Sequence, residues 1–168
     1  MHLIYLFFWD QKPHVLHFEV KRGKIKKSEK GEKNMKTTII AYLASFLTMA
    51  LVDGIWLSLT AKSFYAKNMG PLMNATPYWV PAVLFYLLFP IGLTFLVILP
   101  VMKGGGSLVQ AGLLGALLGL VSYGTYDLTN QATIREWPFV VTVVDLIWGT
   151  SVSAVVSMVA LKIVMKFG

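Results

Sequence analysis

The sequence contains the polar stretch Gly124-Thr125-Tyr126-Asp127-Leu128-Thr129-Asn130. This stretch places an aspartate at the end of an apolar run long enough to cross a bilayer, which takes about 20 residues. A carboxylate there costs several kcal/mol unless it is protonated, paired or in contact with water. Two more isolated acids, Asp53 and Asp145, also interrupt apolar runs. The three acids predict a polar centre between transmembrane helices.

The composition is that of an integral membrane protein. Of the 168 residues, 56% are hydrophobic, and the mean hydropathy is +0.65, above that of an ordinary soluble domain. Of the 15 Lys and Arg residues, nine lie in residues 1–36 and six in residues 37–168. Because the net positive charge belongs mostly to the N-terminal segment, it does not indicate nucleic-acid binding. The expected partner is the lipid bilayer.

The side chains that most often hold metals or haem are missing from the apolar part of the sequence. The chain has no cysteine, which excludes disulfides, thiolate zinc sites and a cysteine nucleophile. Its three histidines, His2, His14 and His17, all precede the first long apolar run. The sequence therefore predicts no metal site and no cofactor, and it identifies no catalytic residue.

Residues 1–34 are predicted to lie outside the membrane domain. The apolar run of residues 1–9 ends after about half the length of a spanning helix. Residues 21–36 are rich in Lys, Glu, Gly and Ser, as disordered segments are. Two interpretations remain open: a basic, disordered arm attracted to anionic lipid, or an upstream extension of a protein whose translation starts at Met35.

Four apolar runs predict an all-α integral membrane protein, a compact bundle of four transmembrane helices. The membrane domain covers residues 35–168. Its spans are expected at residues 37–59, 80–101, 108–127 and 139–161. Residues 60–79 contain turn residues and are predicted to be a polar loop. Pro90 lies inside the second span, where we expect a kink.

The distribution of basic residues predicts the orientation in the membrane. One end of the four-span arrangement carries Lys36, Lys103, Lys162 and Lys166. The other end carries Lys62, Lys67 and Arg135. Because positive charge favours the cytoplasmic side, both termini are expected in the cytoplasm. Asp53 and Asp145 then lie on the order of 10 Å below the outer boundary, at a depth close to that of Asp127.

Helical spacing favours convergence of the acids on one cavity. Gly115-x-x-x-Gly119 allows another helix to approach closely. Asp53-Gly-Ile-Trp56 and Asp145-Leu-Ile-Trp148 are similar to each other, either as the trace of an inverted repeat or by coincidence. The predicted polar centre consists of Asp53, Trp56, Tyr123, Tyr126, Asp127, Asn130, Asp145 and Trp148.

Three motifs, one in each acid-bearing span, carry a family resemblance. They are Leu51-Val-Asp53-Gly-Ile-Trp56-Leu57, Gly124-Thr-Tyr-Asp127-Leu-Thr-Asn130-Gln-Ala-Thr133 and Val144-Asp145-Leu-Ile-Trp148-Gly149. Together they resemble a family of predicted bacterial inner-membrane proteins, domain of unknown function 2177. The resemblance covers about residues 36–165, which agrees with a start at Met35. It implies a four-helix fold in the inner membrane and assigns no activity.

Three functions remain open. In the first, the acids bind a cation or carry protons during ion or small-molecule transport; because four spans are few for an independent transporter, this version predicts a homodimer. In the second, a membrane enzyme acts on a lipid or isoprenoid head group. Asp127 or Asp145 would then be the general base, or the acids would hold Mg²⁺. Tyr123, Tyr126 or Asn130 would orient the substrate. In the third, an accessory protein uses the acids to fix helix register. The sequence leans away from catalysis without excluding it.

Overall fold

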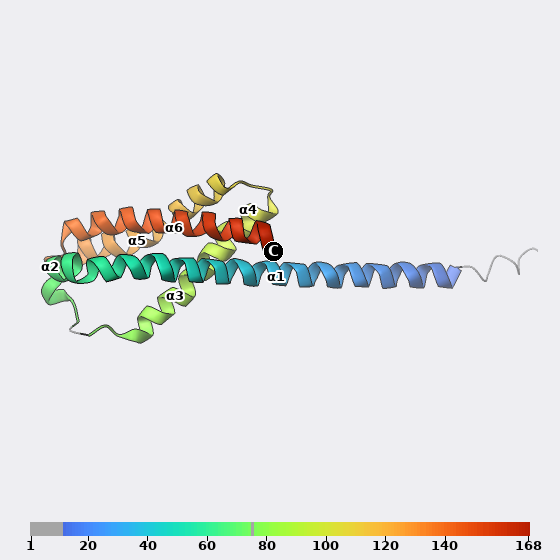
Figure 1. The fold of residues 1–168 in the computed structure, drawn as a ribbon, viewed down its shortest axis with the longest axis horizontal. Coiled ribbons are helices and arrows are strands. Elements are labelled where there is room, and N and C mark those ends of the chain that lie inside the picture. The colour runs from blue at the N-terminus through green and yellow to red at the C-terminus, as the bar shows by residue number, and fades with distance from the viewer. Residues whose placement is uncertain (1–11, 75) are drawn as a thin grey trace, which may run out of the picture. The chain divides into compact units, whose positions relative to one another are not determined.

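The computed structural model describes residues 12–74 and 76–168, which form helices joined by short connections (Figure 1). The α-helices are α1 (Lys12–Thr60), α2 (Ala66–Met69), α3 (Trp79–Leu93), α4 (Leu99–Lys103), α5 (Leu108–Thr133) and α6 (Phe139–Phe167). Shorter elements are the π-helical segments Ala61–Tyr65 and Thr94–Ile98 and the 3-10 turn Gly70–Leu72. The described part of the chain contains no β-strand, which confirms the all-α fold.

The chain divides into two units, residues 1–36 and residues 37–168, and α1 runs through both. Residues 12–34 are helical, where composition predicts a disordered arm. Lys and Glu, which are frequent in this segment, have good helix propensity, and this accounts for the difference. The expectations for residues 1–11 lie outside the described residues. A translation start at Met35 stays a prediction.

Four helical stretches of the described chain are long and apolar enough to cross a membrane. They are Gly31–Met69, Trp79–Lys103, Leu108–Thr133 and Phe139–Phe167. The four-span architecture predicted from the sequence is therefore confirmed. In the unit of residues 37–168, the last residue, Gly168, lies beside Thr37: a Cβ built on Gly168 would be 3.4 Å from the Thr37 Cγ2. Both ends of this unit therefore lie at the same end of the bundle.

Two spans are longer than the sequence analysis predicts. Residues 61–69, assigned to a polar loop, continue the first helix through the π-helical segment and α2. Helix α5 continues six residues past Asp127, which therefore lies inside the helix and not at its end. The polar residues there do not end the helix, because Thr129 and Thr133 each donate a hydrogen bond to a carbonyl one turn earlier, of Thr125 and Thr129.

The second span is interrupted by the π-helical segment Thr94–Ile98, which lies between Pro90 and Pro100. Proline lacks the N–H that a helix needs, and its ring crowds the carbonyl four residues earlier. For Pro100 that carbonyl belongs to Leu96, within the π-helical segment. The wider turn, in which the Leu99 N–H bonds to the Thr94 carbonyl, accommodates the proline. Helix α3 continues through Pro90 to Leu93, and the kink expected near Pro90 stays a prediction.

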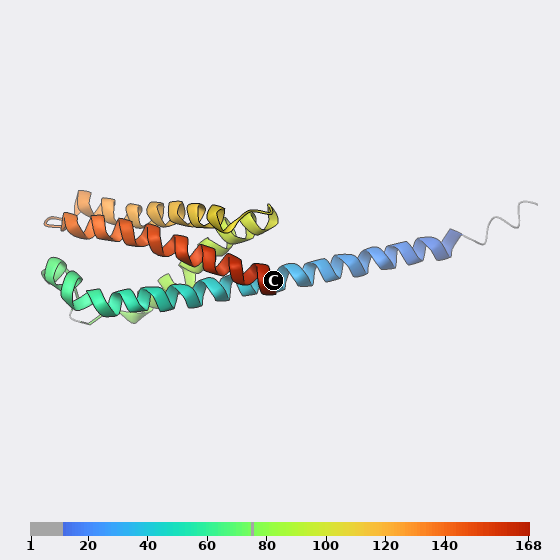
Figure 2. The same ribbon diagram turned by 45° about the horizontal axis from the view of Figure 1, so that its top comes forward.

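Helices α5 and α6 pack most closely and lie side by side in both views (Figure 1 and Figure 2). Their contact depends on residues without side chains. A Cβ on Gly119 would lie 2.2 Å from the Gly149 carbonyl oxygen, and one on Gly115 would lie 2.6 Å from the Ser153 carbonyl oxygen. The role in helix packing predicted for these glycines agrees with this geometry.

Candidate functional site

Asp53 in α1 accepts hydrogen bonds from aromatic side chains on two other helices. The Trp148 Nε1 of α6 donates to Oδ1 over 2.9 Å. The Tyr86 hydroxyl of α3 donates to Oδ2. The Asp53 side chain is only 6% exposed. Three of the four spans therefore meet at one buried carboxylate, and both donors are uncharged groups.

Asp145, near the start of α6, is held in a similar way. The Tyr65 hydroxyl donates to Asp145 Oδ1 over 2.5 Å. The same hydroxyl accepts a hydrogen bond of 3.2 Å from the Trp56 Nε1. Tyr65 is the last residue of the π-helical segment that follows α1, so the continuation of the first span past Thr60 is what brings it to Asp145.

The two tryptophans join these two carboxylate sites. The indoles of Trp56 and Trp148 are stacked, with ring centroids 4.2 Å apart and an interplanar angle of 11°. Because Trp148 binds Asp53 and Trp56 binds Tyr65, the stack completes a continuous path from one acid to the other. We call the following six residues the acid–aromatic network: Asp53, Trp56, Tyr65, Tyr86, Asp145 and Trp148.

Asp127 lies outside the hydrogen bonds of this network. Its side chain is 0% exposed, and neither carboxylate oxygen has a hydrogen-bond partner among the described residues. It is near enough to Asp145 for the two to interact electrostatically. In the described part of the chain, no three His, Cys, Asp or Glu side chains come together so that they could hold a metal ion.

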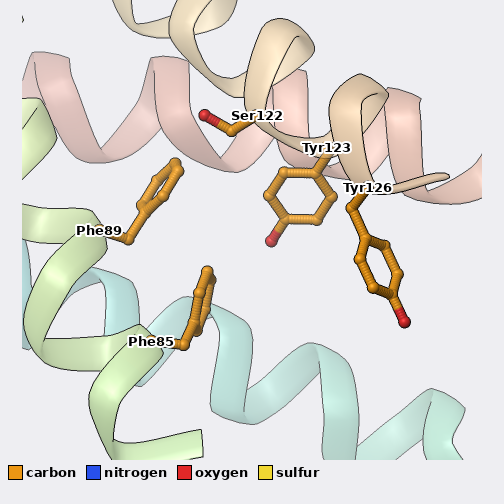
Figure 3. Close-up of a pocket in the computed structure, with 5 residues that line it drawn as sticks. All are labelled: Phe85, Phe89, Ser122, Tyr123 and Tyr126. Atoms are coloured by element: carbon orange, nitrogen blue, oxygen red, sulfur yellow. The ribbon is translucent and has the colours of Figure 1, made fainter. Parts of the chain in front are cut away.

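A pocket of about 430 Å³ opens between α3 and α5. Its lining residues are Phe85, Phe89, Ser122, Tyr123 and Tyr126. Figure 3 shows the rings of Phe85, Phe89 and Tyr123 around one space, whereas the Tyr126 hydroxyl points away from the other four residues. Phe89 and Tyr123 are in edge-to-face contact, with centroids 6.4 Å apart. Phe85 contacts the ring of Tyr86 at 5.3 Å, so the pocket borders the acid–aromatic network.

Tyr123 lines the pocket and also lies near the acids of the acid–aromatic network. Its ring lies over Gly149, where a Cβ would be 2.2 Å from the ring carbons. Its hydroxyl is close enough to Asp53 and Asp145 to interact electrostatically with both. Gly149 directly follows Trp148, and the absence of a side chain there lets the tyrosine ring reach α6.

The structure brings together four of the eight residues predicted for the polar centre: Asp53, Trp56, Asp145 and Trp148. Tyr123 and Tyr126 line the pocket instead. Asn130 interacts with Tyr126. The polar neighbours of Asp127 in sequence do not bind it; Thr129, for example, donates to main-chain carbonyls of α5.

Sequence reasoning missed two members of the network, Tyr65 and Tyr86. A usable signal existed for Tyr86, because a hydroxyl in the middle of an apolar span needs a polar partner when it is buried. No such signal existed for Tyr65. Its segment was predicted to be a loop, and its contact with Asp145 depends on the helix continuing through Ala61–Tyr65.

Comparison with known proteins identifies a family that covers most of the membrane unit. A family model described as "Predicted membrane protein (DUF2177)" matches residues 38–162. No curated protein and no solved structure matches the chain. The matched range includes every residue of the acid–aromatic network and of the pocket.

Proposed function

The chain belongs to the DUF2177 family of predicted membrane proteins, and we propose that it is an ion or small-molecule transporter in which Asp53 and Asp145 bind a cation or carry protons. One observation supports this proposal above others. Asp53 accepts hydrogen bonds from a phenol and an indole, Asp145 accepts one from a phenol, and these donors are neutral. Among the described residues, these carboxylates therefore accept hydrogen bonds from neutral groups and from no Lys or Arg.

The positions of the basic residues strengthen this argument. Helix α5 contains no Lys or Arg, and the lysines of α6, Lys162 and Lys166, lie more than four turns beyond Asp145. Lys62 and Lys67 lie closer to Tyr65 in sequence, but both are exposed. An ionised carboxylate away from water is costly unless a positive charge or a proton compensates it. A proton or a bound cation is therefore the natural counter-charge for this site.

The network also provides a way for the two acids to respond to each other. A cation that binds Asp53 competes with Tyr86 for Oδ2 and weakens the hydrogen bond that Trp148 donates to Oδ1. Movement of the Trp148 indole disturbs the stacked Trp56, which is bonded to Tyr65 and through it to Asp145. Occupancy of one acid is thus expected to change the hydrogen bonding of the other, as transport coupling requires.

The enzyme alternative, which would act on a lipid or isoprenoid head group, has weaker support. The acids do not come together as a metal-ligand set in the described chain. Asp127, a candidate general base, has no described polar partner to orient it. In the accessory-protein alternative, the network only fixes helix register. The flux experiment below separates that alternative from transport.

We further propose the location and assembly of the transporter. Lys103, Lys162 and Lys166 lie at the same end of the bundle as Thr37. Lys36 and eight further Lys and Arg residues precede Thr37 in sequence, whereas the other end carries Lys62, Lys67 and Arg135. The positive-inside rule assigns this end to the cytoplasm, here of a bacterial inner membrane. Four spans provide few helices around a transport path, so a homodimer in the bilayer is the proposed working unit.

Ion flux in proteoliposomes tests the proposal. The full chain is reconstituted with an internal pH-sensitive dye, and proton movement is driven by a membrane potential. We expect flux above that of protein-free liposomes and a reduction of about tenfold or more in Asp53→Asn and Asp145→Asn. Glu136→Gln, which alters an exposed acid between α5 and α6, is the matched control and should leave flux unchanged. Equal flux in all variants overturns the proposal.

A further inference from the structure

The pocket between α3 and α5, together with the acids beside it, indicates a class of ligand. We infer that the protein binds an organic cation, with its apolar body among Phe85, Phe89 and Tyr123 and its positive charge directed to Asp53. This inference rests on the proposed function and names its substrate class.

The size and lining of the pocket support an apolar ligand body. Its volume of about 430 Å³ falls within the range of roughly 300–1,000 Å³ that is usual for small-molecule sites. Apart from Ser122, every lining residue is aromatic. The Ser122 hydroxyl already donates to the Leu118 carbonyl over 2.8 Å. The Tyr126 hydroxyl points away from the other lining residues (Figure 3), which leaves the Tyr123 hydroxyl as the remaining side-chain polar group. The pocket therefore offers few polar contacts to a sugar, an amino acid or another strongly polar neutral molecule.

The charge of the surroundings selects a cation over an anion. Aromatic faces attract cations through their quadrupole, and this attraction grows when water is excluded. No Lys or Arg lines the pocket. The Tyr123 hydroxyl lies within electrostatic range of Asp53 and Asp145, so an anion in this position would meet two acids. A cation in the pocket would contact aromatic faces and would be attracted by both acids.

Tyr86 provides the connection between the pocket and the carboxylate. Its ring contacts Phe85 of the pocket, and its hydroxyl donates a hydrogen bond to Oδ2 of Asp53. A rotation of this one side chain would open a carboxylate oxygen to a ligand without breaking the Trp148 bond to Oδ1. Oδ1 would then stay hydrogen-bonded to Trp148, while Oδ2 would face the positive charge of the ligand.

Equilibrium binding of radiolabelled benzyltrimethylammonium to the purified full chain in nanodiscs tests this inference. Phenylmethanesulfonate, which has a similar shape and the opposite charge, is the competitor. We expect saturable binding of the cation and no competition by the anion. Phe85→Ala should lower the affinity about fivefold or more, and Asp53→Asn about tenfold or more.

The control variant is Phe95→Ala, which removes a ring that is 55% exposed and outside the pocket. Its affinity should equal that of the wild type. Helical content and monodisperse elution establish that each variant is folded. Asp53→Asn should fold, because the amide oxygen can still accept from Trp148 and the amide nitrogen can donate to the Tyr86 oxygen.

The outcomes separate this inference from the proposed function. Cation binding that is non-saturable, or that the sulfonate displaces equally well, overturns the inference, because the pocket then does not select for positive charge. Acid-dependent proton flux without cation binding overturns only the ligand class. Saturable cation binding that depends on Asp53 and Phe85, without acid-dependent flux, supports the binding site and overturns transport.

Discussion

The indole of Trp56 lies flat against the indole of Trp148, with ring centroids 4.2 Å apart and planes inclined by 11°. Each tryptophan follows an aspartate by three residues, Asp53 and Asp145. Each acid is nevertheless reached from the opposite motif: Trp148 donates to Asp53, and Trp56 reaches Asp145 through Tyr65. The two Asp-x-x-Trp motifs therefore interlock between α1 and α6, which gives their similarity a structural role whether or not it reflects a repeat.

This relationship predicts energetic coupling between the two tryptophans. Trp148→Phe preserves a ring but removes the donor to buried Asp53, so it should lower the free energy of unfolding by about 1–3 kcal/mol. Trp56→Phe removes the donor to Tyr65 and should cost less, because Tyr65 keeps its bond to Asp145. In the double variant we expect a deviation from additivity of about 0.5 kcal/mol or more.

Denaturant unfolding in detergent, monitored by helical content, measures this coupling. Trp79→Phe is the matched control, since Trp79 is 76% exposed and outside the network. It should leave stability within about 0.5 kcal/mol of the wild type. Strict additivity of Trp56→Phe and Trp148→Phe would show that the stack transmits nothing between the acids.

Asp127 is predicted to behave in the opposite way to Asp53. Because its two buried oxygens have no described partner, Asp127→Leu should remove a desolvation cost and raise the free energy of unfolding by about 1–3 kcal/mol. Asp53→Leu should lower it, because Trp148 and Tyr86 lose their acceptor. Thermal unfolding of the two variants in one detergent makes the comparison. A loss of stability in Asp127→Leu would reveal a polar partner, such as a bound water or a second copy of the chain.

The sequence predicts the four spans well because apolar length alone determines which segments can cross a bilayer. It predicts their ends less well. Residues 61–69 contain lysines and were assigned to a loop, yet they are helical and carry Tyr65 to Asp145. Polarity can signal exit from the apolar layer, but it does not stop a helix, since a helix satisfies its own main-chain hydrogen bonds in either environment.

For the candidate site, the sequence predicts several of the residues but not the contacts between them. Isolated acids and nearby tryptophans were found from sequence because charge in an apolar run is costly. Which acid binds which aromatic residue was not predictable, since that depends on the register between α1 and α6. Asp127 has polar neighbours in sequence, but one of them, Thr129, donates to the carbonyls of Thr125 and Tyr126. Hydroxyls in helices often bond locally in this way, so sequence proximity says little about a shared site.

The close contact of α5 and α6 predicts a strong effect of one methyl group. In Gly119→Ala the new Cβ would meet the Gly149 carbonyl oxygen at 2.2 Å, and a main-chain atom cannot turn aside. The helices must separate, so the free energy of unfolding should fall by about 1–3 kcal/mol. Gly54→Ala is the control, because a Cβ there has no neighbour within 4 Å. This control should be neutral or more stable, since alanine favours helix. Equal stability of both variants in denaturant unfolding would contradict the close approach.

The proposed topology can be tested directly because the chain contains no cysteine. Gly105→Cys introduces a thiol into the connection between α4 and α5, and Glu136→Cys introduces one between α5 and α6. Helix α5 separates these connections, so they must lie on opposite sides of the membrane if α5 spans it. A membrane-impermeant maleimide added to intact bacterial cells with a permeabilised outer membrane should label Glu136→Cys. It should label Gly105→Cys only after the inner membrane is opened. The reverse pattern would place the termini outside the cytoplasm, and labelling of both in intact cells would contradict the spanning of α5.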